Sequence, residues 1–308
     1  MEPEKENRVN EEEPKIKHLV LSGGCVWGFA MFGILEQAIE SGFLDMAFIE
    51  SIYATSIGSI IGAMFSLKIE THILHDYLIK RPWEAVCKAN RFSVLEIYDG
   101  RGIIHRGFME EIFAPLLKLV ELDIDITLAE FHEYNAIDFH IYSTELNRYE
   151  LVDISFKTHP EWKLLDALYA SSSIPLIFAP IIRDNHCFVD GAFILNYPIT
   201  KVPRDNPKEV LGISLGNPPD NIEEHPITTS SNVVDVVTAT LFNVIYQNRL
   251  FANDNSLPFP YQIVIKHKTT LEDCMKTVYS REERDKLVNM GKEEALLHLC
   301  KKPTETES

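Results

Sequence analysis

Short apolar stretches alternate with longer amphipathic ones along the first part of the chain. Residues 16–21 and 48–55 are rich in β-branched and aliphatic side chains, which is typical of buried strands. Each stretch leads directly into apolar positions at helical spacing, over 29–39 and 57–67, and Gly42 closes the first of these helices. Two strand–turn–helix units in succession predict an α/β fold whose strands are at least partly parallel.

The same alternation continues less regularly toward the C-terminus. Further strands are predicted over 137–146, 149–153, 187–189, 210–215 and 263–265, and further helices over 72–80, 107–120, 162–171, 233–250 and 282–299. We therefore expect a three-layer α/β/α sandwich around a central, largely parallel sheet. Nothing resembles a linker between residues 16 and 300, so we expect one domain there, between an acidic tail (1–15) and a short tail (301–308).

Composition narrows the class of protein. The 308 residues carry 46 Asp and Glu against 29 Lys and Arg, a net charge of −17 that would repel phosphate backbones and excludes nucleic acid as an expected partner. The longest apolar run, 174–182, contains two prolines and is far shorter than the roughly 20 residues of a membrane span. The N-terminus is too acidic for a signal peptide. We expect an intracellular protein, cytoplasmic or peripherally membrane-associated, whose membrane contact is transient and hydrophobic.

The sequence gives little support for a metal site or for disulfide bonds. The five cysteines are scattered and include no CxxC pair, which is typical of reduced thiols and not of a disulfide framework. His72 and His75 are three residues apart on a predicted helix and could chelate a metal, but the HExxH motif is absent. We expect no metal and no cofactor.

A glycine-rich turn, residues 22–28 (SGGCVWG), separates the first strand from its helix. Backbone N–H groups in such a turn point at one spot, where the helix dipole also favours negative charge. Three interpretations of the turn follow: a phosphate-binding loop, an oxyanion hole, or a tight turn with no binding function. Neither GxGxxG nor GK[ST] is present.

The second strand ends in residues 54–58 (ATSIG), which resemble the GxSxG nucleophile elbow with Ala54 in place of the first glycine. The elbow needs small residues two before and two after the serine, because the turn is sharp and the helix passes close to the strand. Ala54 and Gly58 meet this need, so Ser56 is a candidate nucleophile.

A third motif, residues 188–192 (FVDGA), is followed by 196–198 (NYP). An Asp-Gly at a strand end is usually only a turn. Asp190 gains interest because a serine nucleophile needs a base, and an acidic residue at the sheet edge can supply one.

Together with the Ser-rich block 170–180 (ASSSIPLIFAP), these three motifs resemble the patatin-like phospholipase family, in order, over roughly residues 17–200. The resemblance implies a serine lipid acyl hydrolase that cleaves ester bonds of membrane glycerophospholipids. It makes Ser56 the nucleophile and Asp190 its base, a dyad without histidine. It also assigns the oxyanion hole to the backbone of Gly23, Gly24 and Cys25, where loss of one donor costs on the order of 3 kcal/mol in other serine hydrolases.

Three positions depart from the family pattern. Cys25 stands where a third glycine is usual, and a side chain there costs about 1 kcal/mol if the backbone needs a positive φ. Trp27 replaces a usual Lys or Arg, and Ala54 replaces the first glycine of the elbow. Two alternatives therefore remain beside the dyad enzyme. One is a catalytically weakened lipid-binding or regulatory protein, and the other is an α/β-hydrolase whose Ser-Asp-His triad would use His225 or His267.

Overall fold

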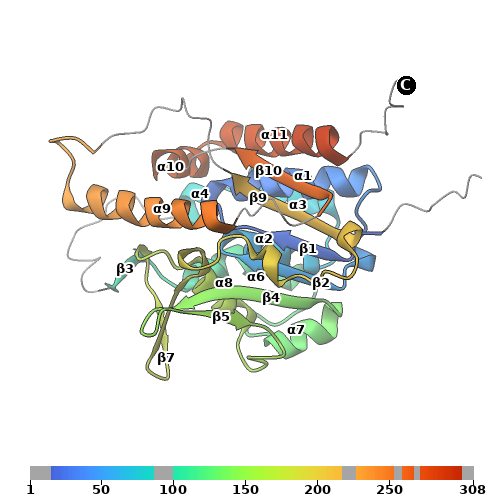
Figure 1. Cartoon of the computed structure of the whole chain (residues 1–308), viewed down its shortest axis with the longest axis horizontal. Helices are drawn as coiled ribbons and strands as arrows, with labels where there is room; N and C mark the ends of the chain where they lie inside the picture. Colours follow the sequence, from blue (N-terminus) through green and yellow to red (C-terminus); the bar gives the residue numbers. More distant parts are fainter. Residues whose placement is uncertain (1–14, 87–99, 217–226, 253–258, 267–270, 300–308) are drawn as a thin grey trace, which may run out of the picture.

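A mostly parallel sheet forms the centre of the protein (Figure 1). The computed structural model describes residues 15–86, 100–216, 227–252, 259–266 and 271–299. Within them the main sheet has eight strands in the order β10-β9-β1-β2-β4-β8-β7, with β5 also paired to β4. These strands are β1 (His18–Leu21), β2 (Ser51–Thr55), β4 (Asp138–Glu145), β5 (Glu150–Ile154), β7 (Ile181–Arg183), β8 (His186–Asp190), β9 (Val210–Gly216) and β10 (Tyr261–Lys266).

The strands from β10 to β4 run parallel, whereas β5 and β8 pair with β4 in the antiparallel direction. A separate small sheet joins β3 (Gly102–Ile104) to β6 (Leu176–Phe178). Because side chains alternate across a strand, Leu19 and Leu21 of β1 pack into the main core on one face, while Val20 packs on the other. Both faces of the sheet are therefore covered.

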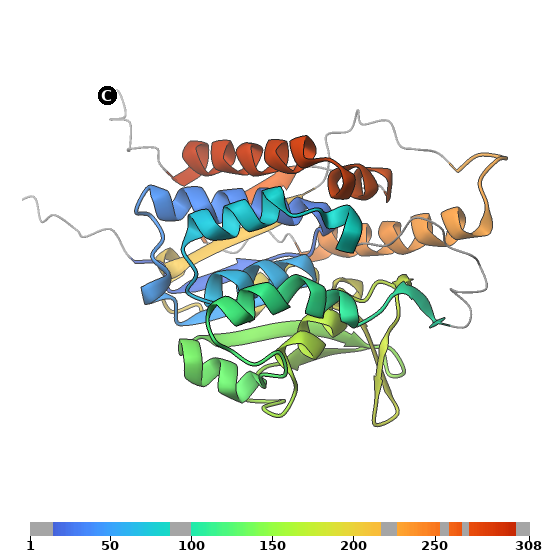
Figure 2. The ribbon, with the colours of Figure 1, turned by 180° about the vertical axis from the view of Figure 1, so that it is seen from behind.

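Helices lie on both faces of the sheet, but unevenly. Figure 2 shows α1, α3, α6 and α11 side by side over one face. On the other face the 3-10 helix Pro198–Lys201 packs against β1 and β2, and α9 lies beside the end of β9 (Figure 1). The described helices are α1 (Gly28–Glu40), α2 (Ile57–Ser66), α3 (Thr71–Lys80), α4 (Trp83–Val86), α6 (Gly107–Leu119), α7 (Leu128–Asn135), α8 (Leu164–Ser172), α9 (Val233–Ala252), α10 (Leu271–Tyr279) and α11 (Arg281–Leu299). The predicted α/β sandwich with a largely parallel sheet is confirmed.

Some predicted elements differ from the structure. The strand expected from residue 48 begins only at Ser51, because Met46–Phe48 forms a 3-10 helix that Asp45 caps through the N–H of Ala47. The proline-interrupted run 174–182 contributes β6 and the first two residues of β7, and α7 and α10 were not predicted. Both helices are short, at 8 and 9 residues, although the apolar residues of α10 (Leu271, Cys274, Met275 and Val278) do recur at helical spacing. Pro115 lies inside α6 without ending it.

The predicted tails and domain limits mostly fall beyond the described residues. Of residues 1–15 and 301–308, only Lys15 is described, so the single domain over 16–300 stays a prediction. Among the helices that the structure describes, none is both long enough and apolar enough to cross a membrane.

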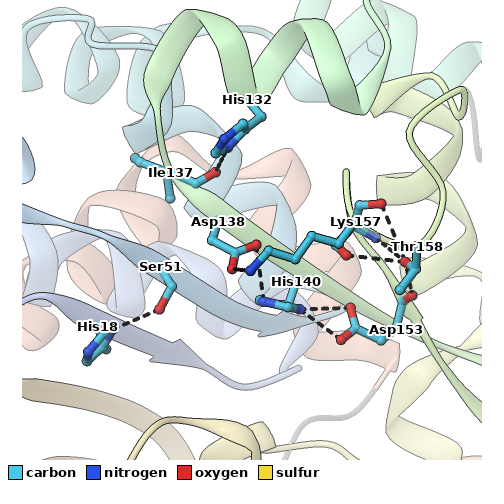
Figure 3. Close-up of polar contacts among 10 residues, drawn as sticks. His18, Ser51, His132, Ile137, Asp138, His140, Asp153, Lys157 and Thr158 are labelled. Carbon is cyan, nitrogen blue, oxygen red and sulfur yellow. Dashed lines mark hydrogen bonds and ion pairs between the residues drawn. The ribbon is translucent and has the colours of Figure 1, made fainter.

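A charged network on the sheet lies away from the carboxyl ends of the parallel strands (Figure 3). The His140 ring on β4 contacts Asp138 at 3.2 Å and Asp153 at 2.8 Å, and it stacks on Tyr53 of β2. Burial alone would lower the pKa of His140, but its bonds to the two carboxylates outweigh burial and raise the pKa to about 9. Burial alone would raise the pKa of Asp138, but its bonds to His140 and Lys157 hold the pKa at about 2.

These shifts predict how the network contributes to stability as pH changes. The pKa of His140 is raised, so its contribution is complete below the ordinary value of 6.5 and is lost as pH rises through about 9. The pKa of Asp138 is lowered, so its contribution is complete above 3.8 and is lost as pH falls toward about 2. We expect His140→Gln to lower the Tm by several degrees at pH 6 and by much less at pH 10. An equal loss of Tm at both pH values, measured by circular dichroism, would show that His140 is not charged in the folded state.

Candidate active site

Ser56 occupies the sharp turn between β2 and α2. Its backbone has φ 54° and ψ −129°, a conformation that non-glycine residues rarely adopt and that is typical of a strained nucleophile elbow. A Cβ atom on Gly58 would lie 2.6 Å from the carbonyl oxygens of both Leu21 and Ser22, so the helix passes against β1 with no room for a side chain. Ala54 is fully buried within β2. The small residues at 54 and 58 therefore serve the close approach that the sequence motif predicts.

Asp190 lies directly against Ser56. The Ser56 hydroxyl donates a hydrogen bond to Asp190 Oδ2 at 2.6 Å, and both side chains are buried. Asp190 Oδ1 accepts the N–H of Ala192 at 2.8 Å, which fixes the carboxylate plane. β8 pairs antiparallel with β4, and Asp190 lies opposite Ser143. The residue before Ser143 on β4 pairs with Thr55 at the end of β2, so this register places Asp190 beside Ser56. The structure thus brings together two residues that are 134 positions apart in the sequence.

The glycine-rich turn lies beside this pair. A Cβ atom on Gly23 would lie 3.1 Å from the Ser56 Cβ and 2.6 Å from Asn196 Oδ1, so a side chain there would have to displace Asn196. The Gly23 N–H donates to the carbonyl of Asn196 at 3.0 Å. This bond departs from the expectation that Gly23 would offer its N–H to an oxyanion. Gly23 instead allows the close approach, and the N–H groups of Gly24 and Cys25 are the remaining candidates.

The backbone of Cys25 has a positive φ, as expected if this position is one where a glycine is usual. Its φ is 51°, in the left-handed region, where a side chain costs about 1 kcal/mol or more. Cys25 begins a 3-10 helix (Cys25–Trp27) that leads into α1, and Trp27 is buried in the main core. The substitution of glycine by cysteine is therefore tolerated at some conformational cost.

Two serines hold the site although the sequence assigned them no individual role. Ser171 Oγ accepts the N–H of Ser56 at 2.8 Å and donates to the carbonyl of Tyr142 at 2.6 Å. The carbonyl of Ser173 accepts the N–H of Asp190 at 3.0 Å. In the sequence, only the Ser-rich block ahead of Asp190 indicated these two serines. They position Ser56 and Asp190 by accepting hydrogen bonds from the backbone N–H groups of those residues.

Ser56 lines a cavity of about 230 Å³. The other lining residues are almost all apolar and come from several helices, among them Ile57, Ile60, Ile61 and Met64 of α2, Phe108, Met109 and Ile112 of α6, and Met275 and Val278 of α10. Such a wall offers few hydrogen bonds to a polar group and suits a hydrocarbon chain.

The histidines considered from the sequence do not assemble with this site as far as the structure describes them. His72 contacts Glu70 at 3.2 Å and His75 contacts Glu36 at 2.9 Å, so the two rings pair with different carboxylates. His225 and His267 lie outside the described residues. Among the described residues, no group of three His, Cys, Asp or Glu side chains is arranged to hold a metal ion.

Comparison with known proteins shows which family and fold the chain resembles. The chain is 27% identical over 188 residues to the probable lipid hydrolase 463L of Invertebrate iridescent virus 6, covering 59% of this chain and 62% of that protein. It is 26% identical over 208 residues to the lysophospholipase NTE1 of Kluyveromyces lactis, covering 66% of this chain but 13% of that protein. The crystal structure of VipD from Legionella pneumophila has a similar fold, with a TM-score of 0.53, 13% identity, and coverage of 93% of this chain and 67% of VipD.

A family model described as patatin-like phospholipase matches residues 19–202. This match begins in β1, includes Ser56, and continues past Asp190 to the Asn196 that holds the glycine-rich turn. It covers more than half of the chain. The protein therefore belongs to the patatin-like phospholipase family, a family of lipid acyl hydrolases.

Proposed function

We propose that the protein cleaves ester bonds of membrane glycerophospholipids through a Ser56–Asp190 dyad. The observation that carries the proposal is the 2.6 Å hydrogen bond between the two side chains at the wall of an apolar cavity. A hydroxyl that already donates to a carboxylate has its general base in place. The apolar lining of the cavity and the family support a lipid ester as the substrate class.

The first step is attack of Ser56 Oγ on the ester carbonyl, while Asp190 Oδ2 takes the hydroxyl proton. A carboxylate with an ordinary pKa near 4 is a weak base for this purpose, so the oxyanion must be stabilised as it forms. The N–H groups of Gly24 and Cys25 and the N-terminus of α2 are the groups that would stabilise it.

Collapse of the tetrahedral intermediate breaks the ester bond, and the leaving alcohol takes the proton that Asp190 accepted. Ser56 then carries the acyl group as an ester. A water molecule attacks this ester with Asp190 again acting as base, and the fatty acid is released with the Ser56 hydroxyl restored. The Ala192 N–H holds the same carboxylate orientation for both steps.

The acyl chain would occupy the cavity during this cycle. Each methylene transferred from water to an apolar site contributes about 0.8 kcal/mol. The α2 residues that line the cavity follow Ser56 along one helix, so the chain would extend from the reacting carbonyl past successive turns of α2.

The direct test is release of free fatty acid from phosphatidylcholine vesicles, measured by mass spectrometry with EDTA present. Neutral vesicles are suitable because a protein of charge −17 gains nothing from anionic lipid. We expect fatty acid to accumulate with the wild-type protein and not with Ser56→Ala. Equal release by the two proteins, or release that EDTA abolishes and calcium restores, would contradict the proposal.

A further inference from the structure

Two cysteines from distant parts of the chain meet at the edge of the candidate site. The sulfurs of Cys25 and Cys274 lie 2.7 Å apart, although 249 positions separate the residues. Cys25 belongs to the glycine-rich turn, and Cys274 lies on α10, which packs against the 3-10 helix that Cys25 begins. Both residues line the cavity that contains Ser56.

The two thiols differ in their surroundings. Cys274 is buried, whereas Cys25 is half-buried. The contact with Cys25 and burial raise the pKa of the Cys274 thiol well above its ordinary value, so Cys274 is protonated at neutral pH. Cys25 is therefore the sulfur that an external reagent reaches first, and Cys274 is positioned to react second.

We infer that Cys25 and Cys274 form a dithiol that a small organic disulfide oxidises to an intramolecular disulfide, and that this bond slows hydrolysis at Ser56. A covalent S–S bond is about 2.05 Å long, so the sulfurs need to approach by only about 0.7 Å. The formation of the disulfide does not depend on the proposed function; only its effect on hydrolysis does.

The exchange needs no reagent beyond the external disulfide. The Cys25 thiolate attacks one sulfur of that disulfide, which forms a mixed disulfide and expels one small thiolate that takes up a proton. Cys274 then loses its proton and attacks the Cys25 sulfur, which expels the second small thiol. The protein loses two hydrogen atoms and two electrons, and the external disulfide is reduced to two thiols.

The bond would affect hydrolysis because Cys25 belongs to the turn that carries the oxyanion donors. Such donors act well only when they are held within about 0.5 Å of the productive position, and a misplacement of about 1 Å can cost two orders of magnitude in rate. A bond that draws Cys25 toward α10 shifts this turn. We expect at least about a tenfold loss of turnover, reversible by dithiothreitol.

Bond formation is tested in a Cys87→Ser/Cys187→Ser/Cys300→Ser background, where only the two cysteines remain. Treatment with bis(2-hydroxyethyl) disulfide should lower the intact mass by about 2 Da and yield a Cys25–Cys274 cross-linked peptide. Adding Cys274→Ala should stop the reaction at the mixed disulfide on Cys25, with a gain of about 76 Da. A background protein that also stops at the mixed disulfide, or does not react, would overturn the inference.

The effect on hydrolysis is measured by dividing the turnover of each oxidised protein by the turnover of the same protein after reduction. The mass measurement does not depend on activity, and it should give the same cross-link with Ser56→Ala. If the reduced protein releases no fatty acid, the proposed function fails while the dithiol is still judged by mass. If the cross-link forms and turnover is unchanged, the regulatory half of the inference is wrong.

Discussion

Replacing Ser56 by alanine or Asp190 by asparagine is expected to reduce turnover by at least about a thousandfold, with the chain still folded. The first change removes the nucleophile. The second keeps the shape of the side chain and its contact with the Ala192 N–H, but removes the base that accepts the Ser56 proton. Fatty acid release under steady-state conditions measures the loss, and circular dichroism checks the fold.

The double variant distinguishes a dyad from two independent contributions. Groups that act as a unit are strongly non-additive, so the double variant should lose little more than either single one. His225→Ala and His267→Ala should each keep most of the turnover, because the proposed base is Asp190. Near-normal turnover in a folded Asp190→Asn protein, or its loss in either histidine variant, would contradict the dyad.

Enlarging Ile60 to tryptophan is expected to separate acyl-chain binding from the chemical step. Ile60 is buried on α2, one turn beyond Ser56, and lines the cavity. Excluding three or four methylenes from the cavity forfeits about 3 kcal/mol, which corresponds to roughly a hundredfold loss of kcat/KM for a long-chain ester. An acetyl ester does not reach past the first turn of α2, so its kcat/KM should change by no more than about threefold.

The acetyl ester controls for damage to the dyad, and Leu119→Trp controls for added bulk. Leu119 ends α6, is exposed, and is not among the cavity-lining residues. Its variant should hydrolyse both esters at the wild-type rate. If Ile60→Trp slows both esters equally, the cavity does not hold the acyl chain or the larger side chain has displaced Ser56.

The turn that carries Ser56 could be predicted from the sequence because its determinants are local. A buried strand, small residues at 54 and 58, and an apolar helix all lie within a few positions of the serine. Asp190 required the order of several motifs, since an Asp-Gly alone indicates only a turn. The structure supplies the long-range part, in which the antiparallel register of β8 on β4 brings Asp190 to Ser56.

Contacts between backbone groups and between distant helices could not be predicted in this way. Which N–H groups of the glycine-rich turn remain available depends on the Asn196 carbonyl, 173 positions away from Gly23. The Cys25–Cys274 contact depends on the packing of α10 against the 3-10 helix of the glycine-rich turn, a long-range contact that local periodicity does not reveal. The network around His140 depends on strand register, because Asp153 reaches it from β5.

Covalent labelling with a long-chain fluorophosphonate tests the central claim most directly. Such a probe reacts with an activated serine, and peptide mass spectrometry locates the site of attachment. We expect attachment to Ser56 in the wild-type protein, none in Ser56→Ala, and a much slower reaction in Asp190→Asn. If the folded wild-type protein remains unlabelled, or if the label is found on another residue, Ser56 is not an activated nucleophile and the dyad account is wrong.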